Sequence, residues 1–256
     1  MVKKYEITND CKTVEGVKVC RIKALKDIHP SFYEVKKGDL GGYVENESNL
    51  SQKGKSWVKD DAIVMGKAEV SDDAWVIGNA VVKDKALVAD DSWVDGGTVV
   101  SSNAVVKDHA VVSGNAVVSG NAVVGGNSGI SGDAKISDHA FIGGDARISD
   151  YVVVTGNAVV EGLTIVECGT KLLDSVKVSG GRVCASENIT FDSQGKLDNY
   201  LKDVKKYEDI KEWFELWVLL MIVSLPAEFW LTGFAKFLVM LRKLILWQWF
   251  LFFSCF

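Results

Sequence analysis

Hydrophobic and polar residues recur in a unit of six from Lys53 to Cys184, without insertion or deletion. This segment of 132 residues holds 22 units. The unit is clearest at residues 113–118, which read Ser-Gly-Asn-Ala-Val-Val. Its sixth position is Val, Ile or Leu from Val58 to Val178, and its fourth position is small, with Ala at thirteen places. A period this regular is a highly specific signal of fold.

The last three positions of each unit alternate like a β-strand. Successive strand side chains point to opposite faces, so the fourth and sixth residues point inward and the fifth points outward. The second and third positions, Gly114 and Asn115 in the clearest unit, hold residue types that tolerate left-handed backbone angles and form a corner. Three strands per coil make a triangular prism with parallel pairing between coils. The pattern predicts an all-β fold, a parallel β-helix of hexapeptide repeats with about seven coils and a length of ~35 Å.

Residues 1–52 lack the unit of six and predict a separate N-terminal element. Residues 5–8 and 17–24 alternate like strands, with the turn-forming residues Asn9, Asp10, Cys11 and Lys12 between them. An uncovered first coil would present unpaired strand groups to other chains. We therefore expect a β cap at residues 1–52 and the β-helix at residues 53–184. The alternative for residues 1–52 is a separate recognition module.

Outward residues that lie 18 positions apart share one face of the predicted prism. The three faces hold Trp57, Trp75, Trp93 and Val111; Val81, Val99 and Val117; and Leu87, Val105, Val123 and Phe141. A tryptophan ladder either stabilises neighbouring coils or forms a binding face. So much outward valine favours lateral association into a homo-oligomer, or docking of the C-terminal tail.

Residues 40–45, Leu-Gly-Gly-Tyr-Val-Glu, are followed by Asn49-Leu50-Ser51, Gly54, Trp57 and then Gly-Asn-Ala units. This series resembles the entry to the coil in the YdcK-like hexapeptide-repeat proteins of bacteria and their phages. The resemblance covers about residues 1–184 and implies a single-stranded, left-handed β-helix. Members of this family are often described as acetyltransferases on the strength of their repeats.

Two of the three histidines, His109 and His139, take the corner position held elsewhere by Asn or Asp. They lie 30 residues apart, which is not a multiple of 18, so they belong to different corners. Hexapeptide-repeat acyltransferases generally use a histidine base beside a loop that leaves the coil, and no loop interrupts this repeat. We expect a protein that is not an enzyme, with no catalytic residues, cofactor or metal site. The alternative is an acyltransferase that uses acetyl-CoA in a trimer, with His109 or His139 as the base.

Residues 185–212 are expected to hold an exit loop at residues 193–196 and an amphipathic helix at residues 197–212. Residues 213–256 form a hydrophobic tail of helices that is expected to associate with a membrane, including a segment long enough for a transmembrane helix. The alternative is a buried pair of helices packed on the valine faces. The residues assigned to the membrane are aromatic or basic: Trp213, Trp217, Trp230, Phe234, Lys236, Phe237, Arg242, Lys243, Trp247 and Trp249.

Composition narrows the partners and the compartment. The net charge is −5 and the basic residues are dispersed, which predicts no nucleic-acid partner. The five cysteines show no metal-ligand spacing. Cys11 and Cys20 could face each other across a hairpin, but no secretory signal precedes them, so reduced cysteines are expected. The lysines before the tail predict a membrane-associated protein with the β-helix on the cytoplasmic side: Lys202, Lys205, Lys206 and Lys211.

These features favour a non-enzymatic, membrane-attached β-helix scaffold for binding or self-association. The resemblance adds a phage or phage-defence setting. In that setting the protein would be a membrane-perturbing effector, held inactive until an unknown protein or small-molecule trigger engages the rod.

Overall fold

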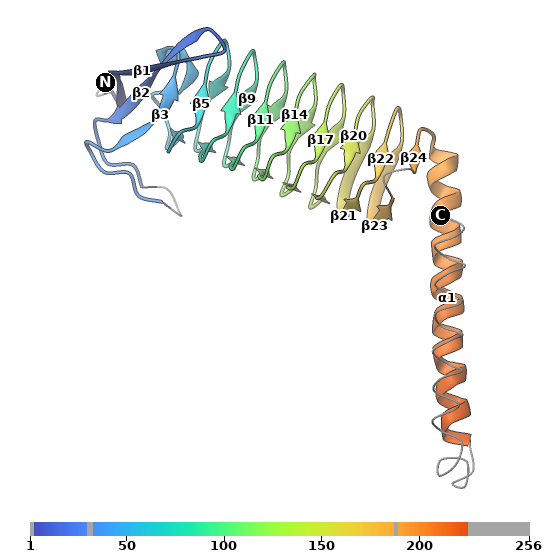
Figure 1. The fold of residues 1–256 in the computed structure, drawn as a ribbon. Coiled ribbons are helices and arrows are strands. Elements are labelled where there is room, and N and C mark those ends of the chain that lie inside the picture. Colours follow the sequence, from blue (N-terminus) through green and yellow to red (C-terminus); the bar gives the residue numbers. More distant parts are fainter. Residues whose placement is uncertain (1–2, 30–32, 187–188, 225–256) are drawn as a thin grey trace. The chain divides into compact units, whose positions relative to one another are not determined.

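The computed structural model of the chain describes residues 3–29, 33–186 and 189–224. Two compact units make up the chain, Met1–Leu197 and Asp198–Phe256. The first unit is a β-solenoid, in which short parallel strands stack coil upon coil (Figure 1). The predicted parallel β-helix is therefore confirmed.

The coils are built from two-residue strands that recur every six residues. Each strand consists of the outward fifth residue and the inward sixth residue of one sequence unit. The strands are β4 (Trp57–Val58), β5 (Ile63–Val64), β6 (Glu69–Val70), β7 (Trp75–Val76), β8 (Val81–Val82), β9 (Leu87–Val88), β10 (Trp93–Val94), β11 (Val99–Val100), β12 (Val105–Val106), β13 (Val111–Val112), β14 (Val117–Val118), β15 (Val123–Val124), β16 (Gly129–Ile130), β17 (Lys135–Ile136), β18 (Phe141–Ile142), β19 (Arg147–Ile148) and β20 (Val153–Val154).

Three faces run along the solenoid, because each coil strand pairs in parallel with the strand 18 residues later, as Val99 does with Val117. The hairpin face contains β3 (Leu40–Val44), β5, β8, β11, β14, β17, β20, β22 (Lys171–Leu172) and β24 (Thr190–Phe191). The tryptophan face contains β4, β7, β10, β13, β16 and β19, and the phenylalanine face contains β6, β9, β12, β15 and β18. Near the C-terminal end, β21 (Val159–Cys168) continues both of these faces and pairs with β23 (Lys177–Ala185).

The solenoid has about eight turns, since the nine parallel strands of the hairpin face are separated by eight steps. The sequence predicts about seven coils for residues 53–184. The additional turn comes from the ends, where β3 pairs with β5 and β24 pairs with β22. The paired residues Tyr43 and Ile63 are not 18 residues apart, and neither are Leu172 and Phe191. This irregular spacing hides both end strands from a search for units of six.

The core is a column of small and aliphatic side chains. Ala116 and Val118 are fully buried, and the fourth and sixth positions are buried from Ser56 to Val178, as the alternation predicts. The backbone N–H groups of one coil donate to the carbonyls of the next, for example Val117 N to Ala134 O at 2.9 Å. Stacking therefore satisfies the backbone polar groups that packing buries.

The corners are turned at the second position of each unit. Gly114 and Asp108 there have left-handed φ angles of 74° and 60°. Asn115, which the sequence also assigns to the corner, is not left-handed; its Nδ2 donates to Asp133 Oδ1 at 3.1 Å. Asp108 Oδ2 likewise accepts from the N–H of Gly126 at 2.9 Å. One residue turns each corner, and polar side chains link it to the following coil.

The N-terminal element contains β1 (Tyr5–Val14) and β2 (Val17–Ala24), which pair antiparallel, and β3, which pairs antiparallel with β2. A short 3-10 helix, η1 (Glu47–Asn49), follows β3. The strands predicted at residues 5–8 and 17–24 are confirmed, but the turn predicted at residues 9–12 is wrong. The chain turns at Glu15 and Gly16, both left-handed, and the turn-forming residues instead fall at an irregularity in the pairing of β1.

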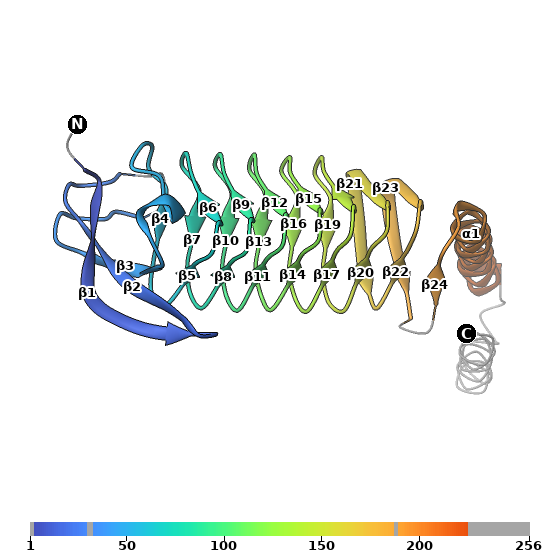
Figure 2. The same cartoon turned by 90° about the horizontal axis from the view of Figure 1, so that it is seen from above.

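The β1–β2 hairpin lies along the hairpin face (Figure 2). Val14 and Val17, next to its turn, pack against a buried cluster that includes Tyr43 and Ile63. Glu15, in the turn, forms an ion pair with Lys83 at 2.8 Å. The hairpin therefore covers the first coils of this face.

Lys4 and Tyr5 close the N-terminal end of the core, and both are fully buried. Lys4 Nζ donates to Ser56 O at 2.8 Å, to Ser56 Oγ at 2.9 Å and to Lys53 O at 3.2 Å. The Tyr5 hydroxyl donates to Leu50 O at 2.8 Å. Burial, assisted by the charge of Lys26, lowers the pKa of the Lys4 amine to about 7. Its protonated form is therefore disfavoured in the folded state.

Helix α1 (Gln194–Ser224) is one element of 31 residues. The predicted loop at residues 193–196 is wrong in part, because the helix already begins at Gln194, and it continues past residue 212 without a break. No helix in the described part of the chain is long and apolar enough to cross a membrane. Residues 225–256, which hold most of the predicted tail, lie outside the described residues.

Candidate binding surfaces

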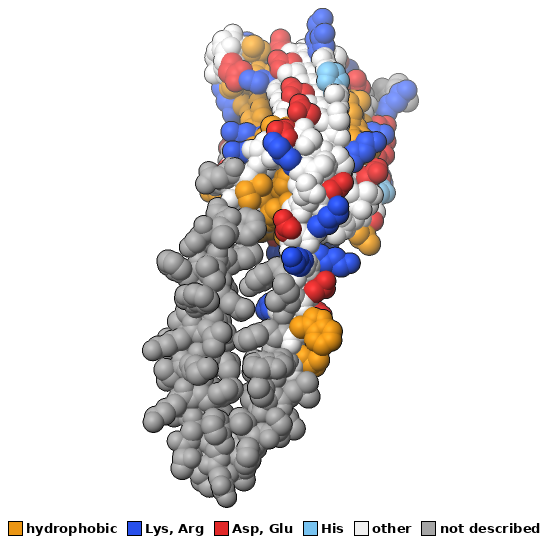
Figure 3. Space-filling view, turned by 90° about the vertical axis from the view of Figure 1, so that its right-hand side faces the viewer, with side chains coloured by type: hydrophobic (Ala, Val, Ile, Leu, Met, Phe, Trp, Pro, Cys, Tyr) orange, Lys and Arg blue, Asp and Glu red, His pale blue; other side chains and the backbone are white. Residues whose placement is uncertain are grey.

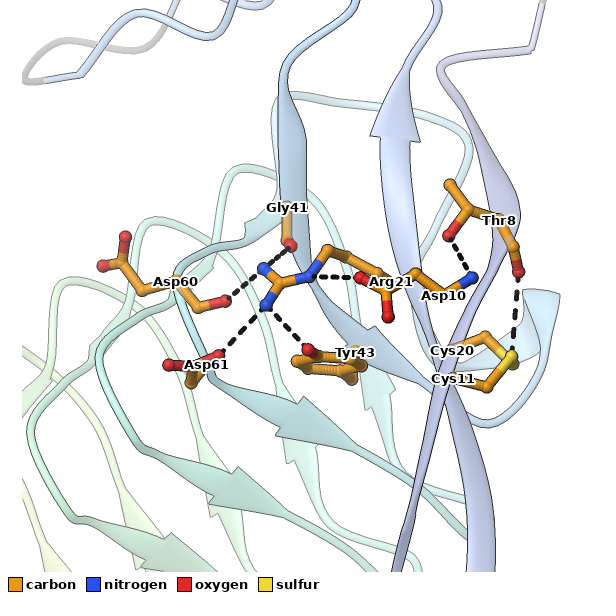
Figure 4. A network of polar contacts seen from close by, with 9 residues as sticks. All are labelled: Thr8, Asp10, Cys11, Cys20, Arg21, Gly41, Tyr43, Asp60 and Asp61. Atoms are coloured by element: carbon orange, nitrogen blue, oxygen red, sulfur yellow. Dashed lines mark hydrogen bonds and ion pairs between the residues drawn. A yellow bond between two sulfur atoms is a disulfide. The ribbon is translucent and has the colours of Figure 1, made fainter.

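Arg21, on β2, joins the cap to the first coils (Figure 4). Its guanidinium lies 4.3 Å from the centre of the Tyr43 ring. It also contacts five oxygens, namely Gly41 O (3.0 Å), Asp60 O (3.1 Å), Tyr43 Oη (2.7 Å), Asp61 Oδ1 (3.1 Å) and Asp10 Oδ2 (3.3 Å). These contacts use the whole fork of donors, so Arg21 acts as a clamp between cap and coil rather than as a ligand site.

The tryptophan face stacks in the predicted order, but its first two members are not exposed. Trp57 and Trp75 are each 1% exposed. Tyr5 meets Trp57 edge-on with 6.5 Å between ring centroids, and Tyr33 stacks against Trp75 at 5.8 Å and Trp93 at 5.7 Å. The prediction of an exposed binding face is corrected for Trp57 and Trp75, which pack between the cap and the coils.

The rest of this face is more open but less apolar. Trp93 is half-buried, and Val111 is 44% exposed. Gly129 follows Val111 in register, and a Cβ added there would meet nothing within 4 Å. Arg147 follows Gly129. The apolar ladder of the tryptophan face therefore ends at Val111.

The hairpin face places Val99 and Val117 side by side in register, both half-buried. The preceding residue of this ladder, Val81, packs against the cluster beneath the hairpin. Lys135 follows Val117 and interrupts the ladder with a charge. These two valines are therefore a short apolar stretch between the hairpin and a lysine.

The phenylalanine face carries a longer apolar ladder, which we call the phenylalanine ladder. It spans four steps of ~4.8 Å, or about 19 Å. Phe141 is 38% exposed, and the other members are half-buried. Among the described residues, this is the longest outward apolar ladder that the hairpin leaves uncovered. Its members, in register, are Leu87, Val105, Val123, Phe141 and Val159.

The two corner histidines lie on different corners and are not brought together. His109 Nδ1 lies 3.5 Å from Asp91 Oδ2, with side chains 65% and 60% exposed. His139 Nε2 lies 3.1 Å from Asn121 Nδ2. A general base needs a partner and an enclosing pocket. His109 has a partner, but both side chains of that pair face solvent.

The cysteines differ from the sequence-based expectation. Cys11 and Cys20 face each other across the hairpin and form a disulfide, and Cys168 and Cys184 form a second one. The prediction of reduced cysteines is therefore wrong for these four residues. The second pair was missed because its members, 16 residues apart, meet only when the last coils stack. A spacing close to one 18-residue coil is the signal that could have revealed it.

Glu167 lies beside the second disulfide. One of its carboxylate oxygens and the two sulfur atoms all lie within 4.8 Å of one another. Arg182 pairs with Glu167 Oε1 through both Nε and Nη2. The N–H of Cys168 donates to Asp150 Oδ2 at 3.1 Å, and Cys168 has a left-handed φ of 74°. A corner residue, a carboxylate and an arginine thus surround this cysteine pair.

The predicted membrane residues fall largely beyond the described chain. Trp213, on α1, is 73% exposed, and Leu216 near it is 53% exposed. Trp217 also lies on α1. The other residues assigned to the membrane, namely Trp230, Phe234, Lys236, Phe237, Arg242, Lys243, Trp247 and Trp249, lie outside the described residues.

Charges of both signs are interspersed on the side of the molecule shown in Figure 3, with no separate basic stripe on that side. The net charge of −5 agrees with this mixture. No protein-family model matches the chain, and no curated protein matches it.

Proposed function

We propose that this protein is a non-enzymatic β-solenoid scaffold that associates with a second copy of itself through the phenylalanine ladder. Its apolar C-terminal segment, residues 213–256, attaches it to a membrane. The observation that carries the first part is the ladder itself, five apolar residues in register that the N-terminal hairpin leaves uncovered. Apolar surface of this continuity is typical of association sites.

The surroundings of the ladder also support an interface. Its edges are corner residues, which include Asn103 and Asn121 on one side and Lys107 on the other. An apolar centre with a polar rim is the usual anatomy of a protein interface. A stable pair buries about 800 Å² per partner, so these rim residues would have to be buried together with the ladder.

Analytical ultracentrifugation of the full chain in a mild detergent tests self-association. We expect an oligomer for the wild type and a shift to monomer for Val123→Lys, because a lysine in mid-ladder would be buried without a partner. Val111→Lys is the matched control, since Val111 is an exposed valine of the tryptophan face. A monomeric wild type, or an equal shift in both variants, would contradict the proposal.

The membrane part rests on the sequence of residues 213–256, which contain five Trp and eight Phe. Burying so many large side chains in water would need a matching apolar surface, whereas a bilayer needs none. Fractionation of cells that produce residues 1–256 or residues 1–212 tests this. The longer chain should sediment with membranes and the shorter one should not, and a longer chain that stays soluble would refute membrane attachment.

The side of the membrane can be tested separately. Lys202, Lys205, Lys206 and Lys211 favour a solenoid on the cytoplasmic side, which we propose, whereas disulfides persist mainly in oxidising compartments. Alkylation of intact cells with a membrane-permeant maleimide distinguishes the two. Labelling of Cys11, Cys20, Cys168 and Cys184 supports the cytoplasm, and unlabelled disulfides would contradict it.

The ion pair between His109 and Asp91 favours a second candidate function, the acetyl-CoA-dependent acyltransferase in a trimer, because a carboxylate can orient an imidazole as a base. Titration with acetyl-CoA tests it. Binding that is lost in His109→Ala or His139→Ala would favour the enzyme. The phage or phage-defence setting rests on the resemblance to YdcK-like proteins, and a membrane-perturbing role would require a trigger that engages the rod.

A further inference from the structure

The last coils bring together three side chains of the kinds that bind thiophilic metals. Cys168 and Glu167 end β21, and Cys184 lies on β23, which pairs with β21 in parallel. The Cα atoms of the two cysteines are 5.3 Å apart. The sulfur atoms and one Glu167 oxygen lie within 4.8 Å of one another. No third potential ligand lies this close to the Cys11–Cys20 pair in the described part of the chain.

We propose that Cys168, Cys184 and Glu167 form a site for a thiophilic divalent cation, Zn²⁺ by preference, when their disulfide is reduced. The proposal stands independently of the scaffold function. Thiolates and a carboxylate are common zinc ligands, and a fourth, solvent position completes a tetrahedron. Oxidation removes both sulfur ligands, so the same residues hold either a disulfide or a metal.

The reduction requires a dithiol. A thiolate of the dithiol attacks Cys184 Sγ, on the more exposed of the two cysteines, and the Cys168 sulfur leaves and takes up a proton. The second thiol of the reductant then attacks the mixed disulfide and releases Cys184 as a thiol. The protein gains two electrons and two protons, and the dithiol loses the same and becomes a disulfide. Zn²⁺ then displaces one proton from each thiol as two Zn–S bonds form.

The backbone allows this exchange without rebuilding the coil. With Zn–S bonds of about 2.3 Å, two sulfur ligands of one tetrahedral ion lie roughly 3.8 Å apart. The parallel pairing of β21 with β23 holds the two Cα atoms, so side-chain rotation supplies the difference. Both contacts of Arg182 go to Glu167 Oε1. The second oxygen, Oε2, has no hydrogen-bond donor among the described residues and is the one placed to bind the ion.

Cobalt titration of the full chain tests the site. The protein is reduced with dithiothreitol, the reductant is removed without oxygen, and Co²⁺ is added as the probe. We expect one equivalent to bind, with thiolate-to-cobalt charge-transfer absorption that disappears when Zn²⁺ displaces the cobalt. The oxidised protein should show no such absorption. Cys168→Ser/Cys184→Ser, which keeps Cys11, Cys20 and Cys255, should lose it.

Two single substitutions test the third ligand without touching the cysteines. Glu167→Gln should weaken cobalt binding by about tenfold, whereas Glu161→Gln, the matched glutamate one unit earlier on β21, should leave it unchanged. Arg182→Gln should strengthen binding by about fivefold, because it removes a positive charge beside the cation.

Circular dichroism checks that each variant is folded. Absence of the band in the reduced wild type, or its persistence in Cys168→Ser/Cys184→Ser, would overturn the site. Equal affinities of Glu167→Gln and Glu161→Gln would overturn the three-ligand arrangement.

Discussion

Replacing Gly126 by alanine should destabilise the solenoid strongly. Gly126 turns a corner with a left-handed φ of 67°. A Cβ added there would lie 2.6 Å from Gly144 O and 2.7 Å from Gly144 N, both backbone atoms of the next coil. Unlike a flexible side chain, this backbone cannot move away without opening the stack. It also carries the hydrogen bond from Asn127 N to Gly144 O at 2.7 Å.

The expected loss has two parts. A left-handed alanine costs about 1–2 kcal/mol, and overpacking against a rigid neighbour costs about 1–3 kcal/mol. The two contributions add to a loss of about 2–5 kcal/mol in the free energy of unfolding. Urea unfolding followed by far-ultraviolet circular dichroism measures this difference between the variant and the wild type.

Gly129→Ala is the matched control, three residues later in the same coil. Gly129 does not have a positive φ, and an added Cβ would meet nothing within 4 Å. Alanine there restricts the unfolded chain and should stabilise the protein by about 0.5–1 kcal/mol. If Gly126→Ala lost less than about 1 kcal/mol, or if both variants lost the same amount, the tight approach of stacked corners would be refuted.

Gly126→Asp should fall between these two variants. Aspartate adopts left-handed angles more readily than alanine. Its carboxylate could also accept from the N–H of Gly144, as Asp108 accepts from Gly126 at 2.9 Å. A loss as large as that of Gly126→Ala would show that these carboxylates do not stabilise the corners.

Three further predictions concern the ends of the solenoid. Arg21→Ala should destabilise the cap by about 2–4 kcal/mol, because it leaves charge-assisted acceptors unpaired; faster hydrogen exchange on β2 would show this, and Arg21→Lys, which keeps only the charge, should recover little. Lys4 has a folded-state pKa of about 7, below the model value of 10.5, so the unfolded chain binds the extra proton between these values and stability should rise with pH across that window, by a few kcal/mol at most. Lys4→Met should flatten this rise in urea midpoints measured from pH 7 to pH 10, and an unchanged slope would contradict the assignment. Cys168→Ser/Cys184→Ser should lower the free energy of unfolding by about 3 kcal/mol under oxidising conditions, as the closed loop of that length implies, and the difference from wild type should vanish in dithiothreitol.

The fold could be predicted because its determinants are local. Within one unit, alternation selects which side chains are buried, as for Ala116 and Val118, and a Gly or Asp at the second position permits the left-handed corner. The same short pattern repeated 22 times leaves no register to choose, so strand order and the three faces follow from counting. Even the face assignment of Trp57, Trp75 and Trp93 follows from their spacing of 18.

The surfaces depended on contacts between residues that the repeat does not relate. Counting places Trp75 outward, but only the folded cap brings Tyr33 onto its ring and buries it. Counting also leaves Cys168 and Cys184 in different units, and only the pairing of β21 with β23 brings them together beside Glu167. A local period determines the direction in which each side chain points. What covers it or meets it is decided by the packing of distant segments, so the sequence alone determined the solenoid, and the tertiary structure decided its exposed faces.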